Sequence, residues 1–139
     1  MAIFNKFHSF VEALAEKKHD LGSDTLKVML TLVAPVVGQS VRADLTEIAA
    51  GNGYTAGGTQ VTILSSAQVS GTYKLVLDDV SFTASGGSIA NFRYPVLYND
   101  SAPNDELIGW WDSGSTQTIT SGNSFVWDAD PTNGVLQLT

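Results

Sequence analysis

The fold class is decided by residues 71–98, whose sequence is GTYKLVLDDVSFTASGGSIANFRYPVLY. β-Branched and aromatic residues are frequent in both halves of this stretch, as is typical of strands. Between the halves lies Ser85-Gly86-Gly87, which is typical of a turn because glycine tolerates a positive φ. The stretch therefore predicts a strand over 71–77 that extends to residue 83, a turn, and a second strand over 88–98.

The same pattern continues on both sides of this stretch. Further strands are predicted at residues 60–64, 107–112, 116–120, 124–128 and 135–139. The segments between them are turn sequences such as Ser113-Gly114 and Ser121-Gly122-Asn123. Many short strands with glycine-rich turns favour a sandwich or a closed barrel. We therefore expect an all-β fold, a jelly-roll-like β-sandwich of about eight strands, with an immunoglobulin-like sandwich as the alternative.

Residues 25–60 connect this region to the N-terminus. The segment TLKVMLTLV at 25–33 is rich in strand-forming residues, and it places Leu26, Val28, Leu30 and Leu32 on one face. Residues 35–60 contain one proline and five glycines, which predicts a long loop with a short helical turn at 45–50. Loops of this length are uncommon and are often functional.

Residues 3–21 are predicted to form an amphipathic α-helix. Its apolar residues fall on one arc about 120° wide; they are Ile3, Phe4, Phe7, Phe10, Val11, Leu14 and Leu21. Gly22 is the expected residue that ends the helix. The sequence thus divides into an N-terminal amphipathic helix, residues 1–22, and a β-sandwich domain, residues 23–139.

The apolar stripe of this helix has two interpretations, because it can pack on its own sheet or dock on a neighbouring subunit. The adjacent pair Trp110 and Trp111 raises a similar question, since neighbouring residues of a strand point to opposite faces. The outward tryptophan is interpreted first as an interface anchor, with a sugar platform or partly covered surface as alternatives. The candidate protein-interface residues are Ile3, Phe4, Phe7, Phe10, Val11, Leu14, Trp110 and Trp111.

Composition narrows the function classes. The chain of 139 residues suits a single domain and carries no cysteine, which fits assembly in a reducing cytoplasm. Its net charge is −7, and the acidic excess lies on the predicted β region, so binding to nucleic acid is not expected. No apolar run is long enough to span a membrane, and the N-terminus does not have the pattern of a secretory signal.

The sequence offers little catalytic chemistry. His8 and His19 are the only histidines, and on the predicted helix both are expected to be solvated and about 16 Å apart. Asp128 and Asp130 only faintly resemble a calcium loop, because the glycine comes late and no glutamate closes the loop. The glycine-rich stretches lack the pattern of a phosphate cradle. We therefore expect no enzyme, no catalytic residue, no cofactor and no metal.

Several stretches resemble a family of small virion structural proteins of tailed bacteriophages. The stretches lie at residues 4–31, 45–58, 70–77, 82–89, 92–100, 107–112 and 125–138, and include FNKFHSFVEALAEKKHDLGSDTLKVMLT, LIGWWD and FVWDADPTNGVLQL. Several such proteins are capsid decoration, or cement, proteins with jelly-roll-like folds. The resemblance implies a homo-oligomer, a dimer or trimer, bound to the major capsid protein or other virion subunits. Its implied location is the virion capsid surface, after assembly in the host cytoplasm.

Two alternatives remain open beside this role: a tail- or fibre-associated virion protein, and a carbohydrate-binding β-sandwich module that uses Trp110 or Trp111. The chain departs from the family pattern at Leu32-Val33 and Val36-Val37, where more polar residues are expected. These four residues are interpreted as an added apolar contact.

Overall fold

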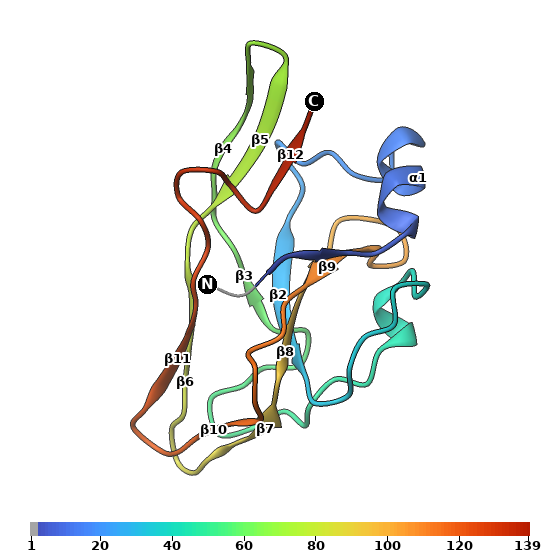
Figure 1. Ribbon diagram of the computed structural model, residues 1–139. Helices are drawn as coiled ribbons and strands as arrows, with labels where there is room; N and C mark the ends of the chain where they lie inside the picture. The colour runs from blue at the N-terminus through green and yellow to red at the C-terminus, as the bar shows by residue number, and fades with distance from the viewer. Residues whose placement is uncertain (1–2) are drawn as a thin grey trace.

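The protein is described by a computed structural model that covers residues 3–139. Within these residues the chain is mostly β, with one α-helix, one short 3₁₀ helix and twelve strands, many of them short (Figure 1). The elements in chain order are β1 (Asn5–Lys6), α1 (Ser9–Ala15), β2 (Leu26–Thr31), η1 (Arg42–Asp44), β3 (Thr59–Gln60), β4 (Ile63–Val69), β5 (Thr72–Leu77), β6 (Val80–Thr83), β7 (Ile89–Phe92), β8 (Tyr94–Asn99), β9 (Leu107–Trp110), β10 (Gln117–Ile119), β11 (Ser124–Trp127) and β12 (Leu136–Leu138).

All strand pairs are antiparallel. The largest sheet has five strands in the order β1-β9-β8-β2-β3, and a second sheet has the order β12-β5-β4. Two further ribbons pair β11 with β6 and β10 with β7. Along the chain, β6 follows β5 and β12 follows β11. These four strands run along one side of the molecule, opposite α1 and η1 (Figure 1).

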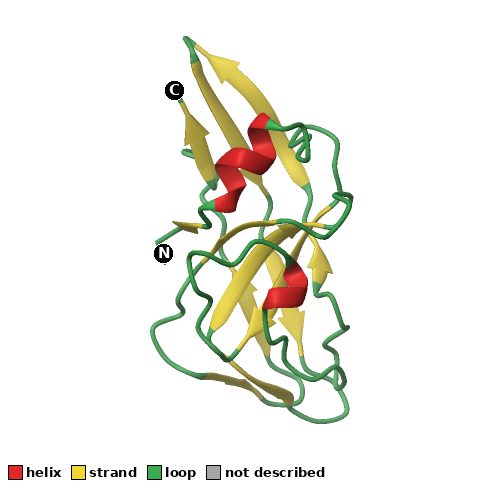
Figure 2. Ribbon diagram, turned by 90° about the vertical axis from the view of Figure 1, so that its right-hand side faces the viewer, coloured by secondary structure: helices red, strands yellow, loops and turns green. Residues whose placement is uncertain are grey.

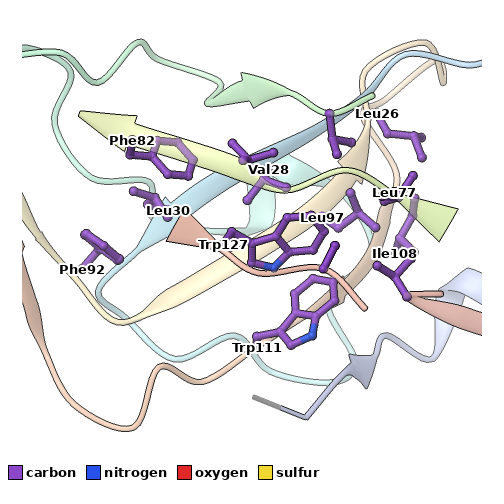
Figure 3. Packing of buried hydrophobic residues seen from close by; sticks show 14 of the residues in the cluster. Leu26, Val28, Leu30, Leu77, Phe82, Phe92, Leu97, Ile108, Trp111 and Trp127 are labelled. Carbon is purple, nitrogen blue, oxygen red and sulfur yellow. The ribbon is translucent and has the colours of Figure 1, made fainter. Parts of the chain in front are cut away.

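The main core lies between the five-stranded sheet and the strands that face it. Leu26, Val28 and Leu30 from β2 pack in the same buried cluster as Leu77 from β5 and Phe82 from β6 (Figure 3). In the same cluster, the rings of Trp111 and Trp127 meet edge to face, with their centroids 4.9 Å apart. Side chains from both groups of strands therefore form one continuous core.

β2 is buried on both of its faces. Met29 points away from the main core into a second cluster, which also contains Phe7, Val96, Tyr98 and Leu107. A strand that is covered on both sides is expected to have an almost continuous apolar sequence, as residues 25–33 do. The predicted strand at 25–33 is therefore confirmed over Leu26–Thr31, and its inward residues Leu26, Val28 and Leu30 are as expected, whereas Leu32 lies beyond it and is exposed.

The prediction of a helix over residues 3–21 is wrong in its extent. Asn5 and Lys6 instead pair with Trp110 and Gly109 of β9, and only Ser9–Ala15 is helical. Phe4 lies against Gly109, where the added Cβ of any other residue would overlap its ring. The spacing of the apolar residues fits a helix, but pairing with β9 makes the beginning of residues 3–21 a short strand instead.

The helix also ends earlier than Gly22. The N–H of Lys18 donates to the carbonyl of Ala13 (2.9 Å), and that of Lys17 to the carbonyl of Leu14 (3.3 Å). These two bonds, with Lys17 at φ 64°, form the Schellman motif that usually contains a glycine. Phe10 and Leu21 belong to the main core, so the N-terminal segment is packed into the body and is not a separate unit.

Two further expectations require correction. The helical turn expected at 45–50 is instead η1, a 3₁₀ turn at Arg42–Asp44 that precedes it. The strand expected to end at residue 64 is replaced by β4, which runs to Val69 and forms a hairpin with β5 through the turn Ser70-Gly71. This hairpin, residues 63–77, extends beyond the rest of the molecule at one end (Figures 1 and 2).

Candidate functional site

The candidate interface residues of the N-terminal segment are mostly used inside the chain. Phe7 and Phe10 are buried, while Phe4 and Leu14 are partly buried against the main core. Only Ile3 and Val11 are well exposed, at 80% and 50%. The apolar stripe therefore packs largely on its own body, in agreement with the first of its two interpretations.

The two adjacent tryptophans point to opposite faces of the five-stranded sheet, as expected. Trp111 is buried in the main core and contacts Phe4 at a centroid distance of 5.3 Å. Trp110 is partly exposed and packs on Phe7 at 4.6 Å. Both rings therefore have aromatic partners within the chain, and neither is a freely exposed anchor.

The most prominent exposed apolar feature is the segment of residues 32–37, LVAPVV, which we call the apolar loop. It follows β2 directly. Leu32 is 45% exposed, Val33 and Val36 are each 61% exposed, and Val37 is 37% exposed. These are the four residues interpreted from the sequence as an added apolar contact, and all four side chains are accessible to a partner.

The backbone of the apolar loop is fixed although its side chains are exposed. Gln39 accepts from the N–H of Val36 through its side-chain oxygen (2.7 Å) and donates from its own N–H to the carbonyl of Val36 (2.9 Å). The carbonyl of Val37 accepts from the N–H of His8 (3.0 Å), at the start of α1. Thr31 donates its hydroxyl to the carbonyl of Val33 (3.0 Å). A partner that binds here therefore meets a preorganised surface, which reduces the entropy lost on binding.

The carboxylate of Glu47 organises the rest of the long loop. One oxygen accepts from the Tyr54 hydroxyl (2.5 Å) and from the N–H of Gly57 (2.6 Å). The other oxygen accepts from the Arg42 guanidinium (2.8 Å). Since the Glu47 side chain is only 17% exposed, these charge-assisted bonds lie in partly buried surroundings. They join residues that are up to 15 positions apart into one rigid structure.

Two tyrosines attach this structure to the five-stranded sheet. The Tyr54 oxygen accepts from the N–H of Leu30 in β2 (3.1 Å), and burial, together with the bond to Glu47, raises the pKa of Tyr54 above its ordinary range. The Tyr98 hydroxyl donates to the carbonyl of Gly57 (2.6 Å). Burial raises the pKa of Tyr98 to about 12, although the nearby Arg42 opposes this rise. Both hydroxyls therefore stay protonated and keep donating hydrogen bonds at physiological pH.

Gly58 lies in one of the glycine-rich stretches that lack the pattern of a phosphate cradle, and the structure shows why this position needs a glycine. Its φ is +81°, and a Cβ at this position would overlap the backbone of Val28 and Met29. The residue is thus a place of close approach between the long loop and β2.

A shallow groove of about 350 Å³ borders the apolar loop. Leu32 and Val33 form one side, and Ile48 and Ala90 contribute further apolar atoms. The loop and the groove together form an exposed apolar surface held by a rigid frame. Such surfaces commonly mark contacts with another protein.

The histidines are arranged differently from expectation. His8 is exposed, but His19 is buried, with its ring 5.3 Å from that of Phe10. Because the helix ends at Ala15, His19 lies in the following loop, which folds onto the body. Its Nδ1 is 3.0 Å from the side-chain nitrogen of Asn99, whose oxygen accepts from backbone N–H groups, so Nδ1 is the acceptor and Nε2 carries the hydrogen. Burial lowers the pKa of His19, and the charges of Glu106 and Asp24 partly oppose this.

Other candidate reacting groups serve local structure. Asp130 accepts from the N–H groups of Thr132 and Asn133, and these bonds lower its pKa; they form the turn before β12. Asp79 accepts from the N–H of Ala129. Within residues 3–139 no three histidine, aspartate or glutamate side chains are placed to hold a metal ion. No helix in the same range is long and apolar enough to cross a membrane.

No protein-family model, no curated protein and no solved structure matches this chain.

Sequence reasoning missed the Glu47 network and the burial of His19. A signal for the first was present, because Glu47, Tyr54 and Gly57 lie close together in the sequence and combine a carboxylate with two donors. The partners Arg42 and Leu30 could not be paired with them without the fold. For His19 the signal was absent, since its burial depends on where α1 ends.

Proposed function

We propose that this chain is a non-enzymatic structural protein of a bacteriophage virion, a capsid decoration or cement protein that binds the capsid shell through protein–protein contacts. The observation that carries the proposal is the apolar loop, four exposed apolar side chains on a backbone held by Gln39, His8 and Thr31. In this proposal the partner is the major capsid protein or another virion subunit. The location is the capsid surface.

The finer fold class belongs to the same proposal. The antiparallel sheets and the single core between them support a jelly-roll-like β-sandwich, in which the twelve short strands correspond to about eight longer ones. For example, β5 and β6 are separated by only Asp78 and Asp79, and β7 and β8 by only Arg93.

The energetics of the apolar loop suit a lattice. Covering one exposed valine or leucine contributes on the order of 1 kcal/mol, so four such side chains give a modest affinity for each subunit. When neighbouring subunits are linked on a shell, the effective concentration multiplies that affinity. A small apolar contact on each subunit is therefore sufficient to cover a particle.

The carbohydrate-binding alternative is less favoured by the geometry, since Trp111 is buried and Trp110 packs on Phe7. The tail or fibre alternative differs from the capsid role in copy number. Quantifying the chain in purified particles distinguishes the two, because a decoration protein is present in many copies and a tail component in few.

The direct test is binding of the purified chain to emptied or undecorated shells of the particle that contains it. We expect Val33→Asp and Val36→Asp each to lower the shell affinity by about tenfold or more, because each places an uncompensated charge in an apolar contact. Val126→Asp is the matched control, since Val126 is 51% exposed on β11, away from the apolar loop. Unchanged affinity of both loop variants, with intact folding, contradicts the role of the loop, and a wild-type chain that does not bind shells contradicts the function.

A further inference from the structure

The outer edge of β4 lies open within residues 3–139. β4 is the terminal strand of the sheet β12-β5-β4, and no backbone hydrogen bond of the described chain joins its outer edge to another segment. Five of its seven residues are exposed; they are Leu64, Ser65, Ala67, Gln68 and Val69. The hairpin that carries it extends beyond the rest of the molecule at one end (Figures 1 and 2).

This edge also lacks the features that usually prevent pairing. Natural edge strands are commonly short, charged or interrupted by proline. The edges of the five-stranded sheet follow this rule, because β1 and β3 have two residues each. β4 has seven residues and contains no charge and no proline. Its one irregularity is the register shift between Ile63 and Ser65.

We propose that β4 pairs antiparallel with β4 of a second copy of this chain, about a two-fold axis at Ser66. The two-residue turn Ser70-Gly71 makes Val69 and Thr72 a hydrogen-bonded pair, and alternation then directs the backbone groups of Ser66 and Gln68 outward. Two copies joined through these groups form one continuous six-stranded sheet. Such an isologous contact closes on itself and gives a dimer.

The side chains of β4 are complementary in this register. Ser66 lies opposite its own copy, and Ser65 lies opposite Ala67, so the centre has small residues that allow close approach. In the same alignment Val69 of one copy comes opposite Ile63 of the other, and Gln68 comes opposite Leu64. Val69 is 73% exposed and Leu64 is 55% exposed in the single chain, and the pairing covers both.

The charge distribution favours the same contact. Residues 62–77 contain no acidic residue and one lysine, Lys74, whereas the whole chain carries a net charge of −7. Two copies that meet through their hairpins keep their acidic surfaces apart. Because the remaining repulsion between two acidic molecules is screened by salt, self-association is expected to become stronger as ionic strength rises.

The contact is small. Stable complexes bury about 1,200–2,000 Å² in total, more than two seven-residue edges provide by themselves, so the dimer is expected to be weak in dilute solution. It becomes important where subunits are concentrated on a surface. The inference does not depend on shell binding, because it concerns the purified chain alone.

The test is sedimentation equilibrium of the full chain from about 10 µM to about 1 mM, at about 0.05 M and about 0.5 M salt. We expect a monomer–dimer equilibrium that shifts toward dimer at the higher salt. Ala67→Lys and Ser65→Asp should each weaken the dimer by about tenfold, since each leaves a charge unpaired in the neutral contact. Gln137→Lys is the matched control, because Gln137 is exposed on β12, two strands away from the β4 edge.

Mixing the two interface variants tests the register. In the proposed pairing, the lysine introduced by A67K faces the aspartate introduced by S65D, so the mixture should form more dimer than either variant alone. A wild-type chain that remains monomeric at the highest concentration in both salts overturns the proposal. A dimer that A67K leaves intact, or a mixture that restores nothing, also overturns it.

Circular dichroism and urea unfolding establish that each variant is folded. If A67K or S65D does not fold, Ser66→Pro replaces it, because the proline removes an outward N–H and leaves the backbone bonds to β5 in place. It also removes the hydroxyl bond to Tyr73, so Ser66→Ala, which loses the same bond but keeps the N–H, is its control. Loss of the dimer in the proline variant supports the proposal, and retention contradicts it. Self-association can fail while shell binding through the apolar loop persists, so the two proposals are separable.

Discussion

The long loop, residues 32–58, and the β4–β5 hairpin, residues 63–77, are both exposed, but different forces hold them. The loop has no regular strand, yet the side chains of Glu47, Tyr54 and Gln39 fix its backbone and leave apolar side chains outside. The hairpin is regular and joins the main core through Leu75 and Leu77 of β5, yet β4 leaves a backbone edge outside. The loop thus exposes apolar side chains, whereas the hairpin exposes unpaired backbone hydrogen-bonding groups.

The largest expected difference between the two regions comes from their glycines. Gly58→Ala should cost roughly 4 kcal/mol or more in unfolding free energy, because the added Cβ overlaps the backbone of β2 and the residue has a positive φ. Gly71→Ala, in the hairpin turn, has a similar φ but nothing within 4 Å of the added Cβ. It should cost about 1 kcal/mol. Urea unfolding of both variants measures the difference, and equal costs would contradict the close approach of the loop to β2.

The second prediction removes the centre of the loop. Glu47→Ala should cost roughly 3 kcal/mol, because it leaves the donors of Tyr54 and Gly57 without their partner. The corresponding change in the hairpin is Tyr73→Phe, which removes the hydroxyl bond to Ser66 (2.7 Å) and should cost less than about 1 kcal/mol.

Hydrogen exchange locates these effects. We expect E47A to speed exchange across residues 42–58 and to leave the hairpin unchanged, because the network does not reach β4. Faster exchange in the hairpin as well would show that the two regions are not independent. Glu12→Ala, an exposed change on α1, serves as the control for general destabilisation.

The third prediction concerns the segment that follows α1 and contains His19. Residues 19–24 lie beside β4, and a Cβ at Gly22 would be 3.4 Å from the Ser66 hydroxyl. Burial of His19 in this segment lowers its pKa in the folded state, whereas the unfolded chain keeps a pKa of about 6.5. Below that value the unfolded state binds a proton that the folded state resists. Stability should therefore fall as the pH drops through about 6.5, until the pKa of folded His19 is reached.

The measurement is urea unfolding at several pH values above and below 6.5. His19→Gln removes the titrating group and should flatten the dependence in this window, whatever its own cost in stability. His8→Gln is the matched control, since it makes the same substitution at an exposed histidine. An unchanged slope in H19Q would show that another group is responsible.

The contrast between the two regions also explains what the sequence could predict. The strands of residues 71–98 were found because each local pattern agrees with its final structure, and β5, β6, β7 and β8 all lie where expected. The apolar spacing of Phe4, Phe7 and Phe10 equally fits a helix, but β1 pairs with β9 because Gly109 leaves room for the Phe4 ring. That choice depends on residues about 100 positions apart, which local periodicity does not detect.

The candidate site was predictable to a similar degree. The unusual apolar character of residues 32–37 was visible in the sequence, whereas the exposure of Leu32, Val33, Val36 and Val37 and the bonds that fix their backbone required the structure. The side chains expected to form the interface, such as Phe7 and Trp111, are instead core residues, because a large apolar side chain near a sheet can be covered by the same chain. The Glu47 network required the fold, since Arg42 and Leu30 meet it only after the loop closes onto β2.

The smallest expected effect compares two turns of similar geometry. Asn52-Gly53 in the loop and Ser70-Gly71 in the hairpin both have two residues at positive φ, and each joins two antiparallel positions. Asparagine tolerates the left-handed conformation better than serine, so Ser70→Asn should stabilise the protein by about 0.5 kcal/mol. Asn52→Ser should destabilise it by about 1 kcal/mol, because it also removes the side-chain bond to the carbonyl of Ser88 (2.9 Å).

Thermal unfolding of the two single variants and of the double variant is sensitive enough for this comparison. The two turns lie in the long loop and in the β4–β5 hairpin, and the hydrogen bonds of Glu47 do not connect these regions. The two changes in unfolding free energy should therefore add in the double variant. A gain from S70N should also slow hydrogen exchange in the hairpin alone, and a rigid hairpin presents a better-ordered β4 edge to a second copy. If S70N stabilises the fold but weakens self-association, β4 must change its conformation in order to pair. In that case the second copy does not bind β4 in the conformation that it has in the single chain.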